Sequence, residues 1–277
     1  MAIEHTLQNK TALFHLIFPR LSEIEKKDWE DNFRVEFTHD STSIEGNTLT
    51  LIETKMILED KIVPAETSLK ELDEIRGHAD AWDFVRESVS KGTPLTENII
   101  RDIHERVLPV KGVGGCYRNI AVYIRGARHV PPNPRHVWDY MKNFDYQIQH
   151  QDFPADMEKA AWLHAELVKI HPFQDGNGRT ARLVMNYHLM AHGFPPTSIK
   201  KKNREEYFKT LEEYALHENI QPFKQLLTEN MNRELDDFLA MHSYAILSAD
   251  LDARPELQGL LEQYREMEKD ATQTKGR

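Results

Sequence analysis

Apolar residues recur every three to four positions along most of the chain, which is the spacing that places them on one face of an α-helix. Two clear stripes run through the middle of the chain: Ile99, Ile100, Ile103 and Val107, then Val137, Met141, Phe144 and Ile148. The pattern continues through 154–170 and 183–189, and two more helices are expected after residue 220, the last over about 254–271. The chain is therefore predicted to be mainly α-helical.

Local signals mark where several of these helices begin. Ser22, Thr50 and Ser68 are each followed three residues later by glutamate, the capping-box pattern that satisfies free N–H groups in a first helical turn. Thr93 precedes Pro94, and proline is well tolerated at the first position of a helix. These signals predict helix starts just after residues 22, 50, 68 and 93.

One segment, residues 118–132, breaks the helical pattern. Apolar side chains alternate there at Ile120, Val122 and Ile124, and Gly126 then allows a turn. Alternation with a period of two and a glycine turn are typical of a β-hairpin. We predict a short hairpin in this segment, whose role could be purely structural.

The densest group of reactive side chains is at residues 171–182, which read His-Pro-Phe-Gln-Asp-Gly-Asn-Gly-Arg-Thr-Ala-Arg. Gly176, Asn177 and Gly178 tolerate positive φ and allow a turn whose backbone N–H groups can face an anion. The next helix begins at this turn, so its unpaired N–H groups and positive dipole end would also attract anions. The segment therefore indicates a phosphate-binding site.

Side chains in the same segment extend this interpretation. Arg179 and Arg182 are three residues apart, so they share one helix face and can both reach phosphate oxygens. Asp175 could hold Mg²⁺, which favours one or two carboxylates together with substrate oxygens. His171 is the general-base candidate because a histidine ordinarily titrates near neutral pH. The combination predicts chemistry on a nucleoside triphosphate.

Residues 171–182 resemble the signature of the Fic family, His-Pro-Phe-x-Asp/Glu-Gly-Asn-Gly-Arg-x-x-Arg, at every specified position. The resemblance implies a helical Fic-fold bundle with one β-hairpin, the flap, near the active site. It also implies transfer of AMP from ATP to a hydroxyl side chain of a target protein, including the enzyme itself. His171 would deprotonate the hydroxyl, Asp175 would position Mg²⁺, and Arg182 would bind the γ-phosphate. Residues 176–178 and Arg179 would hold the other phosphates.

Gly178 separates two activities within this superfamily. In the Doc toxins, which phosphorylate their targets with ATP in a reversed pose, a lysine stands at the position of Gly178. A lysine there would crowd the phosphate site. The glycine therefore favours attack at the α-phosphate, which is nucleotidyl transfer rather than γ-phosphoryl transfer.

A second motif lies upstream, at residues 41–47, which read Ser-Thr-Ser-Ile-Glu-Gly-Asn. It resembles the inhibitory motif of regulated Fic proteins, Ser/Thr-x-x-x-Glu-Gly/Asn. Ser41 and Glu45 are four residues apart and share a helix face, and Gly46 would help to end that helix. The resemblance implies that Glu45 pairs with Arg182 and occupies the guanidinium that the γ-phosphate needs. We therefore predict an enzyme that is restrained by its own Glu45.

The resemblance also suggests contacts outside these two motifs. Ile124, Arg125 and Gly126 would line the cleft for nucleotide and target, and the flap edge would bind a target segment by strand addition. Tyr207 and Phe208 occupy the place where relatives put aromatic side chains against adenine. Alternatively, this aromatic pair is simply part of the helical core.

Composition narrows the class of protein. A formal charge of −10 argues against a general nucleic-acid surface, and the absence of an 18-residue apolar run argues against a membrane-spanning helix. Cys116 is the single cysteine, which excludes an internal disulfide and suits a reducing compartment. We expect it to be an inert, buried thiol. With no evident secretory signal at the N-terminus, we expect a cytoplasmic protein.

The expected organisation has three parts: N-terminal helices with the inhibitory motif at 1–69, a Fic catalytic core at 70–232, and a helical extension at 233–277. The expected partners are ATP and an unidentified target protein bound at the flap, and relatives suggest a homodimer. Three alternatives stay open: removal of AMP from modified proteins by the same site, a non-catalytic ATP-binding scaffold, and transfer of UMP or phosphocholine.

Overall fold

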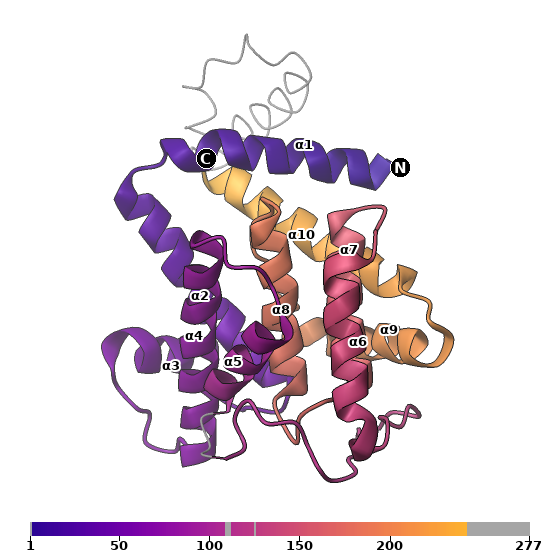
Figure 1. The fold of residues 1–277 in the computed structure, drawn as a ribbon. Helices are drawn as coiled ribbons and strands as arrows, with labels where there is room; N and C mark the ends of the chain where they lie inside the picture. Colours follow the sequence, from indigo (N-terminus) through magenta and orange to yellow (C-terminus); the bar gives the residue numbers. More distant parts are fainter. Residues whose placement is uncertain (1, 109–111, 125, 243–277) are drawn as a thin grey trace. The chain divides into compact units, whose positions relative to one another are not determined.

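The computed structural model describes residues 2–108, 112–124 and 126–242, and within these ranges the chain forms ten α-helices (Figure 1). They are α1 (Ala2–Ile17), α2 (Glu23–Ile44), α3 (Leu51–Lys55), α4 (Leu69–Ser90), α5 (Glu97–Val107), α6 (Val137–His150), α7 (Asp156–Ile170), α8 (Asn177–Ala191), α9 (Arg204–His217) and α10 (Gln221–Met241). Four short 3₁₀ or π turns lie at Phe18–Arg20, Met56–Asp60, Pro134–His136 and Lys201–Asn203. The predicted helical class is confirmed. The helix expected over about 254–271 lies outside the described residues.

Contacts divide the chain into two compact units, Phe33–Leu227 and the pair Met1–Asn32 with Thr228–Arg277. In the second unit, the Phe14 ring packs against Phe238 at 4.7 Å between centroids, and Lys10 pairs with Asp236 at 2.8 Å. All the predicted site residues belong to the first unit. The three-part organisation at 1–69, 70–232 and 233–277 follows different boundaries and stays a prediction.

The predicted capping boxes are present at Ser22, Thr50 and Ser68. Each hydroxyl accepts a hydrogen bond from the backbone N–H three residues later, at 3.3, 3.2 and 3.2 Å respectively. The glutamate at that third position accepts in return from the backbone N–H of the capping residue, at 2.7, 2.8 and 3.2 Å. Local sequence therefore sets these three starts.

The start predicted at Thr93 and Pro94 is wrong, because α5 begins three residues later, at Glu97. Thr96 is its N-cap, and the Thr96 side chain accepts from the Ile99 N–H at 3.4 Å. The Thr93 carbonyl is instead bound by the hydroxyl of Tyr187, which lies on α8. A tertiary contact thus holds Thr93 outside the helix.

The centre of the larger unit is the pair formed by α7 and α8, which lie side by side in Figure 1. Residues 171–176 join the two helices, so the predicted reactive segment occupies the connection between them. Twelve of the fifteen residues of α8 are buried, including Arg179 and Arg182. A helix buried on nearly every side is a core helix, and its polar side chains must find partners inside the protein.

The hairpin predicted for residues 118–132 is not confirmed, because no strand is present among the described residues of this segment. Instead, the buried Arg118 donates to three backbone carbonyls, those of Ile120 at 3.0 Å, Pro132 at 2.7 Å and His171 at 2.8 Å. One guanidinium therefore closes the base of the segment, where a strand ladder had been expected.

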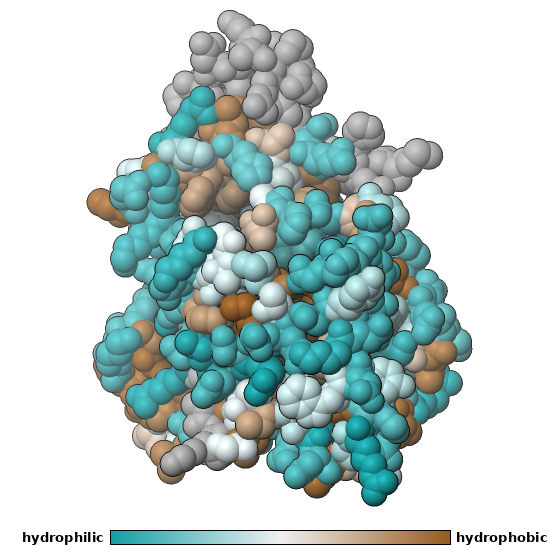
Figure 2. Space-filling view, in the orientation of Figure 1, coloured by the Kyte–Doolittle hydropathy of each residue, from teal (hydrophilic) through white to brown (hydrophobic). Residues whose placement is uncertain are grey.

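Two expectations from the sequence concern membrane-spanning helices and the burial of Cys116. None of the described helices is both long and apolar enough to cross a bilayer. On the face drawn in Figure 2, hydrophobic side chains are scattered among hydrophilic ones. The buried position expected for Cys116 is wrong, since this cysteine is exposed. It lies in the loop after α5, where its N–H donates to the Val113 carbonyl at 3.1 Å in a tight turn.

Candidate functional site

The connection between α7 and α8 is held by its own side chains. His171 ends α7 in the left-handed conformation (φ 51°), which turns the chain sharply after the helix. Phe173 is fully buried, and its backbone N–H and C=O both bond the Asn177 side chain at 2.9 Å. The Asn177 amide thus clamps the loop, which leaves phosphate binding to the backbone and to the arginines.

His104 on α5 supports this loop and was not predicted from the sequence. Its ring stacks on Phe173 with centroids 3.6 Å apart and planes 4° apart. The Gly115 N–H donates to Nδ1 at 3.0 Å, so Nε2 carries the proton and donates to the Asp175 carbonyl at 2.9 Å. Gly176 has φ +76°, and a Cβ there would lie 3.3 Å from His104 Nε2. The sequence did hold a sign that His104 is buried, because this polar residue lies on the apolar face of α5.

Burial lowers the pKa of His104 to about 4, which makes the loop sensitive to acid. A histidine whose pKa is lower in the folded protein loses stability as the pH falls from about 6.5 towards 4. At about 1.4 kcal/mol per pKa unit, His104 accounts for about 3 kcal/mol of this loss. We expect His104→Gln to show a correspondingly shallower fall in unfolding free energy, measured by urea denaturation between pH 7 and 4. His150→Gln, at an exposed position on α6, should keep the wild-type slope, and an unchanged slope in His104→Gln would contradict the assignment.

Arg182 lies at the centre of a second network, which joins α8 to the end of α2. It is 1% exposed, and its Nη2 donates to Glu45 Oε1 at 2.8 Å, which is the predicted ion pair. The Nε and Nη2 atoms also donate to the Ser41 hydroxyl and carbonyl, at 2.9 and 2.8 Å. Nη1 donates to the Tyr207 hydroxyl at 3.0 Å. Gly46, with φ +109°, ends the turn that places Glu45.

Gly178 lies directly against this network. A Cβ built on Gly178 would collide with Glu45 Oε1 and come within 3.2 Å of Arg182 Nη1. Gly178 has ordinary helical backbone angles, and within the turn only Gly176 adopts positive φ. The requirement for glycine at position 178 is therefore one of space beside Glu45 rather than of backbone freedom.

Arg179 and Asp175 form the third part of the site. Arg179 is 2% exposed, and its Nη2 donates to Asp175 Oδ1 at 3.3 Å. Its Nε and Nη1 find no hydrogen-bond partner within the described part of the chain. The Asp175 side chain is exposed, and Oδ1 also accepts the Gly176 N–H at 2.6 Å. A buried guanidinium with unpaired donors at a helix N-terminus is well suited to an anion.

His171, the C-cap of α7, is neutral near pH 7. Burial, followed by the charges of Arg118 and His129, lowers its pKa to about 4 against the opposing effects of the Val168 carbonyl and Glu45. Its Nδ1 lies 3.3 Å from the Val168 carbonyl, which favours the proton on Nδ1 and leaves Nε2 with a free lone pair. An unprotonated Nε2 is what a general base requires.

The two predicted aromatic residues differ in burial, since Tyr207 is buried and Phe208 is half-buried. Tyr207 is 1% exposed, and its hydroxyl contacts Arg182 and the buried His164 Nε2, each at 3.0 Å. Phe208 packs on the Tyr207 ring at 5.2 Å and under the Arg204 guanidinium at 4.7 Å. Tyr207 thus supports Arg182 directly, and an adenine contact stays a prediction for both aromatic residues.

The structure describes two of the three residues predicted to line the cleft from the flap. Ile124 is half-buried, and its carbonyl accepts the Ala127 N–H at 3.1 Å in the turn around the exposed Gly126. Arg125 lies outside the described residues. The structure therefore brings Ser41, Glu45 and Arg182 together but leaves the predicted contacts of the flap as predictions.

Known proteins that resemble this chain belong to one family. Residues 94–189 match the model of the Fic/DOC family. The protein adenylyltransferase Fic of Nematostella vectensis is 38% identical over 207 residues, covering 72% of this chain and 47% of its own length. The protein of the same name from Drosophila virilis is 37% identical over 205 residues, covering 72% and 41%. The chain therefore spans less than half the length of these two curated relatives.

Solved structures give the same result. A Fic domain containing signaling protein from Bacteroides thetaiotaomicron is 26% identical, with a TM-score of 0.75 over 85% of this chain and 95% of that one. Fic-1 from C. elegans, residues 134–508, is 27% identical, with a TM-score of 0.77 over 87% of this chain and 72% of that one. The helical core described above is a Fic fold.

Proposed function

Because the chain carries a Fic/DOC domain at residues 94–189, we propose that it is a protein adenylyltransferase restrained by its own Glu45. It transfers AMP from ATP to a hydroxyl side chain of a target protein and releases pyrophosphate. The curated relatives that bear the name protein adenylyltransferase support this activity. The observation that carries the proposal is the buried Arg182 at the start of α8, whose carboxylate partner among the described residues is Glu45.

The proposed chemical step uses groups of residues 171–182. His171 Nε2 accepts the proton of the target hydroxyl as its oxygen bonds to the α-phosphorus, and the bond to the bridging oxygen of pyrophosphate breaks. The N–H groups of the first turn of α8 and the unpaired donors of Arg179 stabilise the phosphates. Neutral His171 is ready to accept a proton at pH 7 because its pKa is held to about 4.

Mg²⁺ fits the carboxylate of Asp175. Its side chain is 61% exposed, and only Oδ1 is used within the described residues. Mg²⁺ typically keeps several waters and takes one or two carboxylates plus substrate phosphates, so a single exposed carboxylate meets its needs. When bound, the ion would neutralise phosphate charge.

Glu45 restrains the reaction by competing for Arg182. As long as Arg182 Nη2 is paired with Glu45 at 2.8 Å, that nitrogen is engaged and cannot bind a γ-phosphate. ATP can still enter, but its α-phosphate is poorly aligned for in-line attack. Because Glu45 also fills the space above Gly178, it blocks the position where phosphate would approach the helix.

The choice of isotope label tests the reaction class. We expect the Glu45→Gly protein, incubated with Mg²⁺ and ATP, to become labelled from α-labelled ATP but not from γ-labelled ATP, and a competing excess of UTP to have little effect. Incorporation from γ-labelled ATP would indicate a kinase. Binding of ATP without any incorporation would favour the scaffold alternative. Release of AMP from protein already labelled would favour the reverse activity.

The remaining partners belong to the same proposal. A target protein bound at residues 118–132 is supported by three large hydrophobic side chains exposed there, Ile120, Tyr123 and Val130 (54, 81 and 62% exposed). We infer that these side chains contribute to the contact with the target protein. The homodimer and the cytoplasmic location stay predictions.

A further inference from the structure

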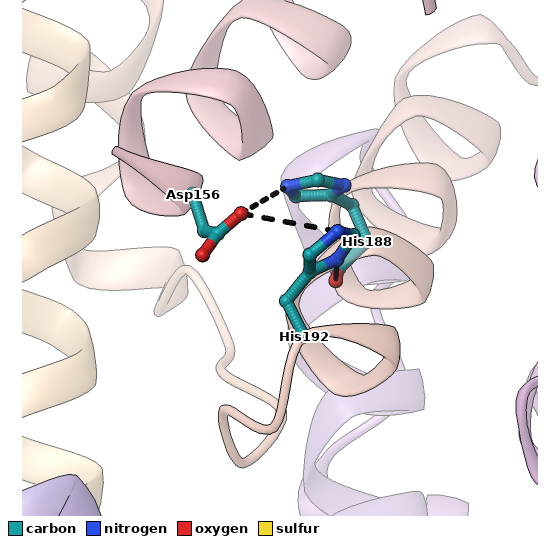
Figure 3. Close-up of side chains that lie close together, drawn as sticks. All are labelled: Asp156, His188 and His192. Atoms are coloured by element: carbon teal, nitrogen blue, oxygen red, sulfur yellow. Dashed lines mark hydrogen bonds and ion pairs between the residues drawn. The ribbon is translucent and has the colours of Figure 1, made fainter. Parts of the chain in front are cut away.

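A separate cluster of metal-ligand side chains lies at the other end of the α7–α8 pair from residues 171–176. Asp156 opens α7, His188 lies in the last turn of α8, and His192 is the C-cap of α8. The three side chains point toward one another in Figure 3. No group of this cluster takes part in the chemistry proposed above.

The geometry suits a single ion. Asp156 Oδ1 lies 3.6 Å from His188 Nε2 and 3.8 Å from His192 Nε2. One ligand atom from each residue lies within 4.8 Å of the other two. Ligands at about 2.0–2.1 Å from a tetrahedral Zn²⁺ are about 3.3 Å from each other. The two Asp156 distances are within about half an ångström of this value, so modest side-chain movements would bring all three ligand atoms to one ion.

His188 supplies the observation that distinguishes this cluster from an ordinary surface group. Its side chain is 4% exposed, and its Nε2 has no hydrogen-bond partner in the described structure. A buried ring nitrogen without a partner is costly, and it is aimed at the Asp156 carboxylate.

A hydrogen bond to the backbone orients the His192 ring. Its Nδ1 lies 2.8 Å from the His188 carbonyl, so the proton is placed on Nδ1 and the lone pair of Nε2 faces Asp156. A backbone carbonyl behind the ring is a common support for metal-bound histidine. His192 and Asp156 are 45 and 46% exposed, which gives an ion a path from solvent.

We propose that Asp156, His188 and His192 bind a Zn²⁺ ion that ties the first turn of α7 to the last turn of α8. Two imidazoles and one carboxylate suit Zn²⁺, whereas Mg²⁺ and Ca²⁺ prefer oxygen ligands. Because α7 delivers His171 and α8 carries Arg179 and Arg182, this ion stabilises the pair of helices on which the proposed active site is built. Three protein ligands leave one tetrahedral position, which water fills.

Zinc titration of the full chain tests the proposal. After chelator treatment, we expect calorimetry to show one Zn²⁺ bound per chain and Co²⁺ to give the visible absorption of a tetrahedral nitrogen and oxygen site. His192→Ala and Asp156→Asn should each weaken Zn²⁺ binding at least about tenfold, since loss of even a supporting group costs that much. Both positions are half-exposed, so both variants should fold and melt like wild type without zinc.

Matched controls identify the site of binding. Cys116→Ser removes the exposed thiol, His150→Ala removes an exposed histidine elsewhere, and Asp175→Ala removes the carboxylate of the proposed active site. All three should bind Zn²⁺ as wild type does. Unchanged affinity in His192→Ala and Asp156→Asn, or loss of binding in Cys116→Ser, would overturn the assignment. So would binding of Mg²⁺ with the affinity of Zn²⁺.

Discussion

Replacing Glu45 by glycine is expected to raise the rate of AMP transfer from ATP by about 10- to 100-fold. The reason is the release of Arg182, which loses its 2.8 Å bond to Glu45 and becomes available to the γ-phosphate. A hydrogen bond between charged groups contributes about 1.5–3 kcal/mol, which corresponds to this range of rates. The measurement is the initial rate of incorporation from α-labelled ATP into the protein and into a lysate.

Three variants make this test specific. Glu66→Gly removes a glutamate from an exposed loop and should leave the rate unchanged. Glu45→Gln keeps an oxygen that can accept from Arg182 but loses the charge, so its rate should lie between wild type and Glu45→Gly. Adding Arg182→Ala to Glu45→Gly should abolish the gain, because both changes act on one pair. Equal rates for wild type and Glu45→Gly would exclude restraint by Glu45.

Replacing His171 by alanine in the Glu45→Gly protein is expected to lower kcat/KM by about 10²- to 10⁴-fold, the usual contribution of a general base. The loss should fall on kcat, since no phosphate contact is assigned to His171. ATP affinity, measured by calorimetry, should stay within about a factor of two because the helix N-terminus and the arginines are intact. Full activity in His171→Ala would remove the assigned base.

A neighbouring histidine provides the control for His171. His129 Nε2 lies 2.8 Å from the Lys169 carbonyl, and its charge acts on His171, but no step uses it. His129→Ala should therefore keep most of the activity. The pH profile adds an independent check. Because the pKa of His171 is about 4, kcat/KM should show no acid inflection between about pH 5.5 and 7.5.

Local sequence predicted the helices well because helix signals act over a few residues. The capping boxes at Ser22, Thr50 and Ser68 and the stripe of α6 all depend on contacts within one or two turns. Predictions from local sequence were wrong where a residue distant in the sequence contacts the segment. Tyr187 holds Thr93 and delays α5, and the carbonyls bound by Arg118 replace the ladder of the expected hairpin.

The candidate site also has a part that local sequence predicts and a part that depends on distant contacts. The order of residues from His171 to Arg182 already placed a base, a turn and two arginines at one helix start, because helical periodicity fixes their spacing. The pairing of Glu45 with Arg182 joins residues 137 positions apart and was expected only from resemblance to a family. His104 supports Asp175, which is 71 positions away in the chain. The helical periodicity of α5 indicates that His104 faces the core but does not indicate which residue it contacts.

The sequence by itself determined the chemistry available at the start of α8, since this depends on neighbouring residues and on the dipole of one helix. Only the tertiary structure decided which distant side chains control that chemistry. Packing places Glu45 over Gly178, stacks His104 on Phe173, and brings Asp156 to His188 and His192. These contacts depend on how whole helices pack, and no local pattern in the chain encodes that arrangement.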